Sequence, residues 1–391
     1  MKVSILTPNF SSNCLGRAYL LAQLISKFMD VEIIGPILNN KIWPPLSNQS
    51  QVEIQFKPIH WTRTQSFYTF IKKVSSIIEG DILYVSKPML TSFGVALAIQ
   101  KQNKMPLILD IDDWDLGFVI EHIKTRRIER WLFNTLPHKF NGYQALLDCY
   151  VLEKIAQSMK EEIQITVSNS FLQKKFGGTI IWHTRDENVF DPKRYSSYDS
   201  RKYFRIPEDK IVLMFFGTPR PHKGIEELIR AIYITKELRN NQEIVLVIGG
   251  VGEDRYSKKI VQTGRRLLGD KVFFIGYIPF KENPKAVIAS DIYIIPQKKT
   301  HASFGQLPAK LFDAMAMARA IISTDISDIP RILEGVGIII SSEASVLEKS
   351  IGEEILYLAD NPSEIKKLGK KARKKFIGQY GFDCMRKILS I

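Results

Sequence analysis

Short, almost uninterrupted runs of Val, Ile, Leu and Phe recur along the chain and alternate with helical patterns. They cover residues 3–8, 31–36, 52–56, 82–86, 107–111 and 165–168 in the first half, and 211–217, 243–250, 272–278, 291–296 and 320–325 in the second. Strands that are apolar on both faces are typical of parallel sheets with helices on each side. We therefore predict an α/β protein with two doubly wound domains, whose ligands lie beyond the carboxyl ends of the strands.

Composition narrows the class of protein. The 391 residues suit two or three domains of about 150 residues each. Hydrophobic residues make up 45% and charged residues 25%, which excludes a disordered or low-complexity scaffold. The formal charge of +14 favours anionic partners such as nucleotides, phospholipid head groups or nucleic acid. Because the basic residues are dispersed and no nucleic-acid-binding motif accompanies them, we predict no nucleic-acid partner.

Cysteine usage and hydropathy indicate the compartment. Cys14, Cys149 and Cys384 lie far apart and form no CxxC pair, so neither a zinc site nor a disulfide framework is predicted. Residues 1–10 are typical of a first strand rather than a signal peptide. The chain has no apolar run of the ~18 residues that a membrane-spanning helix needs. We expect a cytoplasmic protein, with peripheral binding to the inner face of the cell membrane as a further hypothesis.

The segment FFGTPRPHKGIEELIRAI joins a buried strand to an amphipathic helix through a proline-rich loop. The strand ends at Gly217, Thr218 follows, and the helix begins after Lys223. Free backbone N–H groups and the helix dipole favour an anion at such a junction, and Arg220 and Lys223 add full positive charges. The simplest ligand is a diphosphate, and the alternative is a solvated loop whose lysine faces water.

A second loop and helix occur in SFGQLPAKLFDAMAMARAIISTD. The loop contains Ser303, Phe304 and Gly305. We expect the helix to begin near Pro308, because proline suits a first helical position. Lys310 and Asp313 are three residues apart and so share one face of the helix. The helix N-terminus can hold phosphate, and Asp313 can accept hydrogen bonds from ribose hydroxyls.

GTPRPHKG, IGGVGED and LPAKLFDAMAMARAIISTD, in this order, resemble the donor-binding domain of GT-B glycosyltransferases, in particular glycosyltransferase family 4 (group 1). The resemblance is specific from residues 163 to 330 and implies two facing Rossmann-like domains with a nucleotide-sugar between them. It implies an acceptor-side domain at 1–195, a donor domain at 196–375, with the boundary near 190–210, and a last helix at 376–391 that crosses back to the N-terminal domain. No cofactor and no metal ion are expected.

The resemblance also implies roles for single residues. The family's KG lysine, which contacts the donor diphosphate, falls on Lys223; Thr218 stands where the family often has arginine, so we expect Arg220 to substitute for it. Gly305 occupies the position of the family's first glutamate and Asp313 that of the second, ribose-binding one. The predicted donor-binding residues are Gly16, Gly217, Thr218, Lys223, Gly250, Ser303, Phe304, Gly305, Lys310, Leu311 and Asp313.

Two N-terminal segments are candidates for the other side of the site. Gly16, at a helix start, resembles the family's glycine loop. LDIDDWD places four acids at a strand end, and Asp112 stands where the family often has histidine. Clustered carboxylates raise one another's pKa, so we predict an acid or base at Asp112; a helix cap is the alternative. The D-x-D string resembles metal-dependent GT-A enzymes, but two domains with separate phosphate loops need no metal. The predicted catalytic residues are Asp112, Lys223 and Arg220, with His183, Asp186 and His301 as secondary candidates.

The resemblance implies a metal-independent, hexosyltransferase-like enzyme that retains the anomeric configuration. Cations and helix N-termini would neutralise the departing diphosphate. Residues 117–147, which look like a helical insertion, and residues 66–78 interleave Lys and Arg with aromatic residues, as interfacial membrane binding requires. A packed helix with a solvated basic face is the alternative. We predict a hydroxyl acceptor, with a lipid-linked glycan or glycolipid at an anionic membrane surface as the hypothesis. The alternative function is a GT-B nucleotide-sugar-binding protein without transferase activity.

Overall fold

The computed structural model describes residues 1–38, 40–48, 54–61, 66–125, 141–241 and 243–389. Contacts divide the chain into two compact units. Unit 1 comprises Met1–His183, Thr300–Leu307 and Met385–Ile391, and unit 2 comprises Thr184–Lys299 and Pro308–Cys384. The predicted domain boundaries at residues 195 and 375 differ from these limits and stay a prediction about domains.

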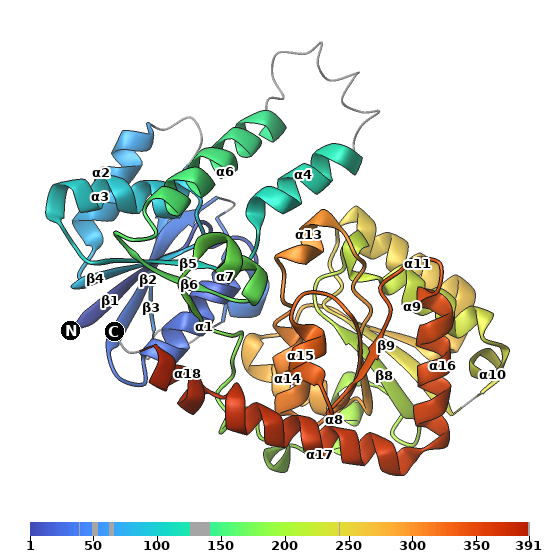
Figure 1. The fold of residues 1–391 in the computed structure, drawn as a ribbon. Coiled ribbons are helices and arrows are strands. Elements are labelled where there is room, and N and C mark those ends of the chain that lie inside the picture. The colour runs from blue at the N-terminus through green and yellow to red at the C-terminus, as the bar shows by residue number, and fades with distance from the viewer. Residues whose placement is uncertain (39, 49–53, 62–65, 126–140, 242, 390–391) are drawn as a thin grey trace. The chain divides into compact units, whose positions relative to one another are not determined.

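Unit 1 is built on a seven-stranded sheet in the order β3-β2-β1-β4-β5-β6-β7, with parallel pairing between neighbours (Figure 1). Its strands are β1 (Lys2–Leu6), β2 (Asp30–Ile37), β3 (Gln55–His60), β4 (Ile82–Ser86), β5 (Leu107–Ile111), β6 (Gln164–Val167) and β7 (Thr179–Ile180). Its helices are α1 (Leu15–Ile25), α2 (Phe67–Ile77), α3 (Val95–Asn103), α4 (Asp115–Thr125), α6 (Asn141–Ser158), α7 (Ser170–Phe176) and α13 (His301–Phe304), with the short turns η1 (Pro44–Leu46) and η2 (Leu90–Gly94).

Unit 2 is built on a six-stranded parallel sheet in the order β10-β9-β8-β11-β12-β13. Its strands are β8 (Ile211–Phe216), β9 (Ile244–Gly249), β10 (Val272–Ile275), β11 (Ile292–Ile295), β12 (Ala320–Thr324) and β13 (Ile338–Ile340). Its helices are α8 (Ser197–Phe204), α9 (Ile225–Ile234), α10 (Lys236–Asn240), α11 (Arg255–Leu268), α12 (Asn283–Ile288), α14 (Lys310–Ala316), α15 (Ile329–Leu333), α16 (Leu347–Asp360) and α17 (Pro362–Gln379), with the turns η3 (Pro192–Arg194), η4 (Pro221–Lys223), η5 (Gly269–Lys271) and η6 (Phe280–Glu282). Helix α18 (Phe382–Ile388) begins in unit 2 and ends in unit 1.

The prediction of two doubly wound parallel sheets is confirmed, and the burial of the strands explains it. Leu246 of β9, Ile229 of α9 and Ile351 of α16 are almost completely buried in one core of unit 2. Each such side chain contributes roughly 1.5–3 kcal/mol when it leaves water. Apolar residues on both faces of a strand therefore require helices on both sides of the sheet, as Figure 1 shows for each unit.

The predicted elements differ from the observed ones mainly at their ends. The strand predicted at 272–278 stops at Ile275, before Gly276, and the strand predicted at 52–56 is observed as β3 from Gln55. The short strands β7 and β13 were too brief to give a hydropathy signal. Within the predicted insertion, α4 and α6 are helical, and residues 126–140 lie outside the described residues. The last helix, predicted at 376–391, is observed as the end of α17 followed by α18, with residues 380–381 between them.

Both sheets reverse their strand order once. In unit 1 the reversal lies between β1 and β4, and in unit 2 it lies between β8 and β11. Loops at the carboxyl ends of the strands on either side of such a point leave a crevice, which is where doubly wound proteins bind their ligands. Each unit therefore has its own candidate ligand-binding edge at the reversal point of its sheet.

Candidate functional site

The carboxyl ends of β8 and β9 bring two glycines together beside the reversal point of unit 2. Gly217 follows β8 with φ 136°, and Gly250 follows β9 with φ 78°, both of which favour glycine. A Cβ atom at position 250 would lie 2.8 Å from the carbonyl carbon of Gly217. The two backbones thus pass too closely for side chains to fit between them. The end of β8 therefore exposes backbone atoms rather than a side chain.

Gly224 fixes the path by which the next loop enters α9. Its φ is 70°, and a Cβ atom there would collide with the carbonyl that follows β11. The first turn of α9 carries Glu226 and Glu227, whose carboxylates are paired with lysines of other elements. The negative charges next to the free N–H groups of α9 are therefore neutralised by these lysines. A bound anion would need additional positive charge from other side chains.

Lys223 and Arg220, the two predicted diphosphate ligands, lie in different environments. The Lys223 Nζ donates a hydrogen bond of 2.8 Å to the carbonyl oxygen of Thr218 and so lies back along the loop after β8. The Arg220 side chain is 49% exposed; it donates to the Pro219 carbonyl and lies 3.8 Å from the carboxylate of Asp254. Their contact with a donor stays a prediction, with Lys223 the better placed of the two.

Lys310, the first residue of α14, points its amine at the end of β8. Its Nζ lies 3.6 Å from the centroid of the Phe215 ring, and a Cβ atom on Gly217 would lie 2.9 Å from it. The Nζ atom is buried and has no hydrogen-bond partner among the described residues. Burial lowers the pKa of Lys310 well below its usual value; Lys223 lowers it further and Asp313 acts against both.

Asp313, the predicted ribose ligand, is held by an arginine that sequence reasoning missed. Its Oδ1 accepts a hydrogen bond of 2.5 Å from the Arg185 Nε, and both side chains are 7% exposed. The guanidinium also donates to the Thr184 carbonyl and lies over the rings of Phe190 and Phe280. Burial raises the pKa of Asp313, and Arg185 opposes this shift. No local pattern links two residues this far apart in sequence, so the sequence offered no direct signal for this pair.

The predicted donor loop with Ser303, Phe304 and Gly305 belongs to unit 1. The Gly305 carbonyl accepts a hydrogen bond of 3.1 Å from the Asn169 side chain. A Cβ atom on Gly305 would collide with Trp114. This contact explains why glycine, and no carboxylate, stands at the family's first glutamate position. Donor binding by the three loop residues stays a prediction.

In unit 1, the first acid of LDIDDWD is structural. Asp110 accepts two hydrogen bonds, of 2.9 and 2.8 Å, from the Nε and Nη2 of Arg17, and a third from the Thr166 hydroxyl. Arg17 also donates to the Ile181 carbonyl at 2.8 Å. The Arg17 and Asp110 side chains are 1% and 0% exposed, so this pair joins α1 to β5 and is closed to ligands.

The other three acids of that segment surround a buried lysine, which sequence reasoning also missed. Lys87 follows β4 with φ 70°, and its Nζ lies 2.9 Å from Asp112, 2.9 Å from Asp113 and 3.3 Å from Asp115. Burial raises the pKa of Asp115 to about 6; Lys87 opposes this, and the two neighbouring carboxylates add to it. Asp115 thus shares the Lys87 amine with Asp112 and Asp113, and the catalytic role of Asp112 stays a prediction. The position of Lys87 directly after a strand was the available signal.

The remaining predicted residues are mostly packed into the fold. Gly16 lies in the first turn of α1, and a Cβ atom there would make an ordinary 3.5 Å contact with Trp43, so its own conformation does not require glycine. Leu311 is fully buried and His183 is 6% exposed. The Asp186 carboxylate accepts a hydrogen bond from a backbone N–H two residues later. Their roles, and that of His301, stay predictions.

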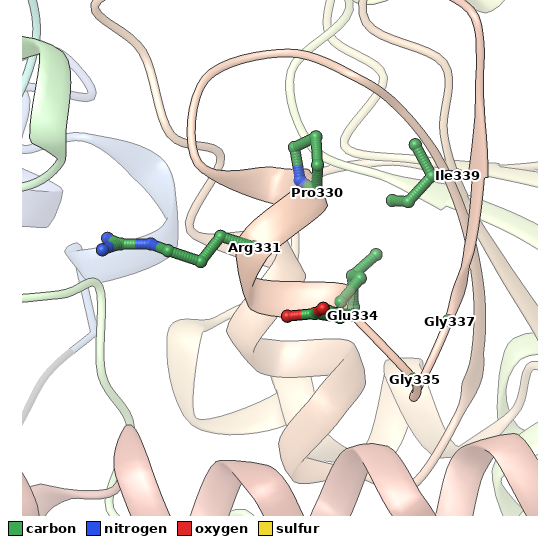
Figure 2. Close-up of a pocket in the computed structure, with 7 residues that line it drawn as sticks. Pro330, Arg331, Glu334, Gly335, Gly337 and Ile339 are labelled. Carbon is green, nitrogen blue, oxygen red and sulfur yellow. The ribbon is translucent and has the colours of Figure 1, made fainter.

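A hollow of about 520 Å³ lies away from the residues that the sequence singled out. It is lined by Pro330, Arg331, Leu333, Glu334, Gly335, Gly337 and Ile339. Figure 2 shows the Arg331 guanidinium pointing away from Ile339, so its charge is not aimed into the hollow. We assign no ligand to it, because the convergent polar groups are at the end of β8.

Three further findings concern metals, membranes and thiols. Across the described ranges, no three His, Cys, Asp or Glu side chains are grouped to hold a metal ion. No helix in that part of the chain is long and apolar enough to cross a membrane. The three cysteines are free thiols, and burial raises the pKa of Cys149 to about 12.

Comparison with known proteins finds a family match for the part of the chain that holds Lys310. Residues 197–375, somewhat less than half of the chain, match the family model of glycosyl transferases group 1. An uncharacterized glycosyltransferase of Methanocaldococcus jannaschii is 32% identical over 120 residues, which are 30% of this chain and 28% of that relative. The chain thus matches less than a third of the length of this curated relative.

Solved structures match the whole fold. Anabaena HepE, solved in complex with UDP-glucose, has a TM-score of 0.72 at 15% identity, covering 99% of this chain and 97% of its own. Sucrose-phosphate synthase from Thermosynechococcus elongatus has a TM-score of 0.71 at 14% identity, covering 99% and 96%. The chain has the GT-B fold, as predicted.

Proposed function

We propose that this chain is a retaining, metal-independent glycosyltransferase that moves a hexose from a nucleotide-sugar to a hydroxyl acceptor. The observation that carries the proposal is the buried Lys310 amine, aimed at Gly217 with no hydrogen-bond partner among the described residues. A buried basic group without a partner is costly, and a donor diphosphate supplies the matching charge. The group 1 domain at 197–375 and the UDP-glucose complex of Anabaena HepE support this choice of ligand.

The donor would use two sets of groups in unit 2. Lys310, Lys223 and the backbone at Gly217 would bind the diphosphate and stabilise the charge that develops on it as the glycosidic bond breaks. Asp313 would accept hydrogen bonds from the ribose hydroxyls, with Arg185 as a positioning residue that fixes its orientation. Leaving-group stabilisation of this kind contributes on the order of 2.7–4 kcal/mol per donor removed in other enzymes.

On the acceptor side, unit 1 offers the carboxylates around Lys87. Asp115, with its pKa raised to about 6, is suited to take a proton from a hydroxyl near neutral pH. Asp112 occupies the strand end and shares the same lysine, so it is the alternative base. Retention, as in the family the sequence resembles, would follow if the hydroxyl attacks from the face that the diphosphate leaves.

The acceptor that we propose is a lipid-linked glycan or glycolipid at an anionic membrane surface, reached by a cytoplasmic protein. On α2, Tyr68 is 59% exposed and the Lys72 amine lies 4.6 Å from its ring centroid. On α6, Tyr150 is 50% exposed, with the Lys154 amine at 5.7 Å. Paired aromatic and basic side chains suit an interface. Residues 126–140 of the predicted insertion, which include Trp131 and Phe133, lie outside the described residues.

Liposome co-sedimentation tests the membrane hypothesis separately from catalysis. The full chain should pellet with vesicles containing an anionic lipid and stay in the supernatant with neutral vesicles. Replacing Tyr68 and Tyr150 with serine should reduce pelleting, because each tyrosine offers exposed apolar surface. Absence of pelleting with anionic vesicles would remove the membrane from the proposal while leaving the donor site intact.

Donor turnover tests the activity. The chain is incubated with UDP-, GDP- and ADP-glucose, with and without EDTA, and nucleoside diphosphate release is measured. We expect release from one donor, unchanged by EDTA and lost in Lys223→Ala. A protein that binds a nucleotide-sugar and leaves it intact would instead be the binding-only alternative, which the glycine at position 305 and the threonine at position 218 keep open.

A further inference from the structure

The Lys310 amine is in an unusual environment for a lysine. It is buried over the Phe215 ring at 3.6 Å and next to Gly217, without a hydrogen-bond partner among the described residues. An ammonium group has three N–H donors, and each needs an acceptor when water is excluded. A neutral amine in the same place leaves far less polarity unsatisfied.

The charged groups that act on the amine come from the loop after β8 and from α14 itself. Lys223, a like charge on the loop, disfavours a second ammonium. Asp313, one turn along α14, favours it, but this carboxylate is already engaged by Arg185 at 2.5 Å. The Tyr293 hydroxyl, on the neighbouring strand β11, donates to the Phe216 carbonyl and offers the amine no charge.

The balance of these effects favours the neutral amine in the empty site. A cation over an aromatic ring gains up to about 2 kcal/mol when desolvated. Removing an ammonium group from water costs several kcal/mol even after the protein relaxes. The cost exceeds the gain unless an anion joins the site, at which point the attraction between close opposite charges is added.

We propose that Lys310 is uncharged in the empty site and takes up one proton from solvent when the diphosphate of a nucleotide-sugar binds. This inference rests on the proposed function, because it takes the diphosphate as the ligand at Lys310. Binding would then neutralise the donor charge with a positive charge that exists only in the complex. The site would bind the donor more weakly as the pH rises, since the proton becomes harder to acquire.

Isothermal titration calorimetry of the full chain with UDP-glucose, GDP-glucose and ADP-glucose, in buffers of different ionisation enthalpy, counts the protons. The diphosphate of a nucleotide-sugar has no protonation step near neutral pH, so an uptake belongs to the protein. We expect uptake that approaches one proton per bound ligand, with Kd rising up to tenfold per pH unit above the pKa of the empty site.

Two matched variants assign the proton to a residue. Lys310→Arg carries a permanent charge, so it should bind with no proton uptake and with Kd independent of pH. Lys223→Arg makes the same change on the neighbouring lysine and should keep the uptake. Far-ultraviolet circular dichroism checks that each variant folds, and absence of uptake by the wild type refutes the inference whether or not a variant folds.

Each result bears on a different claim. Binding without proton uptake by the wild type, at every pH from 6 to 9, would overturn this inference and leave the proposed function standing. Proton uptake that persists in Lys310→Arg and disappears in Lys223→Arg would assign the proton to Lys223, and this result would also overturn the inference. Failure of all three nucleotide-sugars to bind at any pH would overturn both the proposed function and the inference.

Discussion

Replacing Arg185 with methionine should strongly destabilise unit 2. The change removes the guanidinium that donates to Asp313 at 2.5 Å and leaves a carboxylate with a 7% exposed side chain without its partner. Breaking a buried ion pair by removing one member costs about 3–5 kcal/mol. Solvent screening reduces this figure little, because both side chains are almost fully buried. Burial already raises the pKa of Asp313, so the remaining carboxyl would protonate and lose its charge for ribose binding.

The assay must follow unit 2 specifically. All five tryptophans precede residue 184 and therefore lie in unit 1, so urea unfolding should be followed by far-ultraviolet circular dichroism rather than by tryptophan fluorescence. The double variant Arg185→Met with Asp313→Asn removes both charges and should recover a large part of the lost free energy. As a surface control, Lys367→Met breaks an exposed pair with Glu364 and should leave the transition unchanged.

Two outcomes would show that Arg185 and Asp313 do not form a buried, coupled pair. If Arg185→Met costs less than about 1 kcal/mol, the pair behaves like an exposed one and is not the buried contact described above. If the double variant loses as much as the two single losses added together, the side chains act independently. Either outcome would remove Arg185 as the residue that positions Asp313.

Three further predictions follow from the geometry. Gly250→Ala places a Cβ atom 2.8 Å from the carbonyl carbon of Gly217, at a residue whose φ is 78°. The substitution should lower the free energy of unfolding by about 1–3 kcal/mol, measured as a lower urea midpoint. Unchanged stability would mean that the loop moves to accommodate the methyl group. Because the pKa of Asp115 is raised from 3.8 to about 6, the folded protein binds this proton more tightly than the unfolded chain does. The free energy of unfolding should therefore fall by roughly 3 kcal/mol from this group as the pH rises from about 4 to about 6. Asp115→Asn should flatten this fall, and a variant with the same pH profile as the wild type would contradict the prediction. One of UDP-, GDP- or ADP-glucose should raise the melting temperature of the wild type, with a stabilisation of about 2.7 kcal/mol at a hundredfold excess over its Kd. The same nucleotide-sugar should not raise the melting temperature of Lys223→Ala or Asp313→Ala. A shift in both variants equal to that of the wild type would show that the donor binds at another place.

The strand pattern made the fold predictable. Runs such as IVLMFFG and EIVLVIGG are apolar on both faces, which leaves few arrangements other than a covered parallel sheet. Two local features could also be predicted: the loop after Gly217, and helix α14 with Lys310 and Asp313. Both follow from residue spacing within a single segment. The short strand β13 could not, since three residues carry no periodicity.

The contacts that tune the site were out of reach from the sequence. Arg185 contacts Asp313, which lies 128 residues further along the chain. Lys87 contacts Asp112 because strands β4 and β5 are neighbours in the sheet, and not because of their spacing in the sequence. The same holds for Gly305: the sequence shows that a carboxylate is missing there, and the structure supplies the cause, which is the close approach of the Trp114 Cβ atom. Such pairs are set by which strands are neighbours, and a single sequence contains no local signal for that.

Nucleoside diphosphate release by the wild type and by Lys310→Met tests the central claim most directly. The claim is that the amine of Lys310, buried beside Gly217, receives the diphosphate of a nucleotide-sugar whose glycosidic bond the protein breaks. It predicts release from one of UDP-, GDP- or ADP-glucose by the wild type, and a loss of at least a hundredfold in the variant, about 2.7 kcal/mol. A folded variant that releases the diphosphate as fast as the wild type would contradict it.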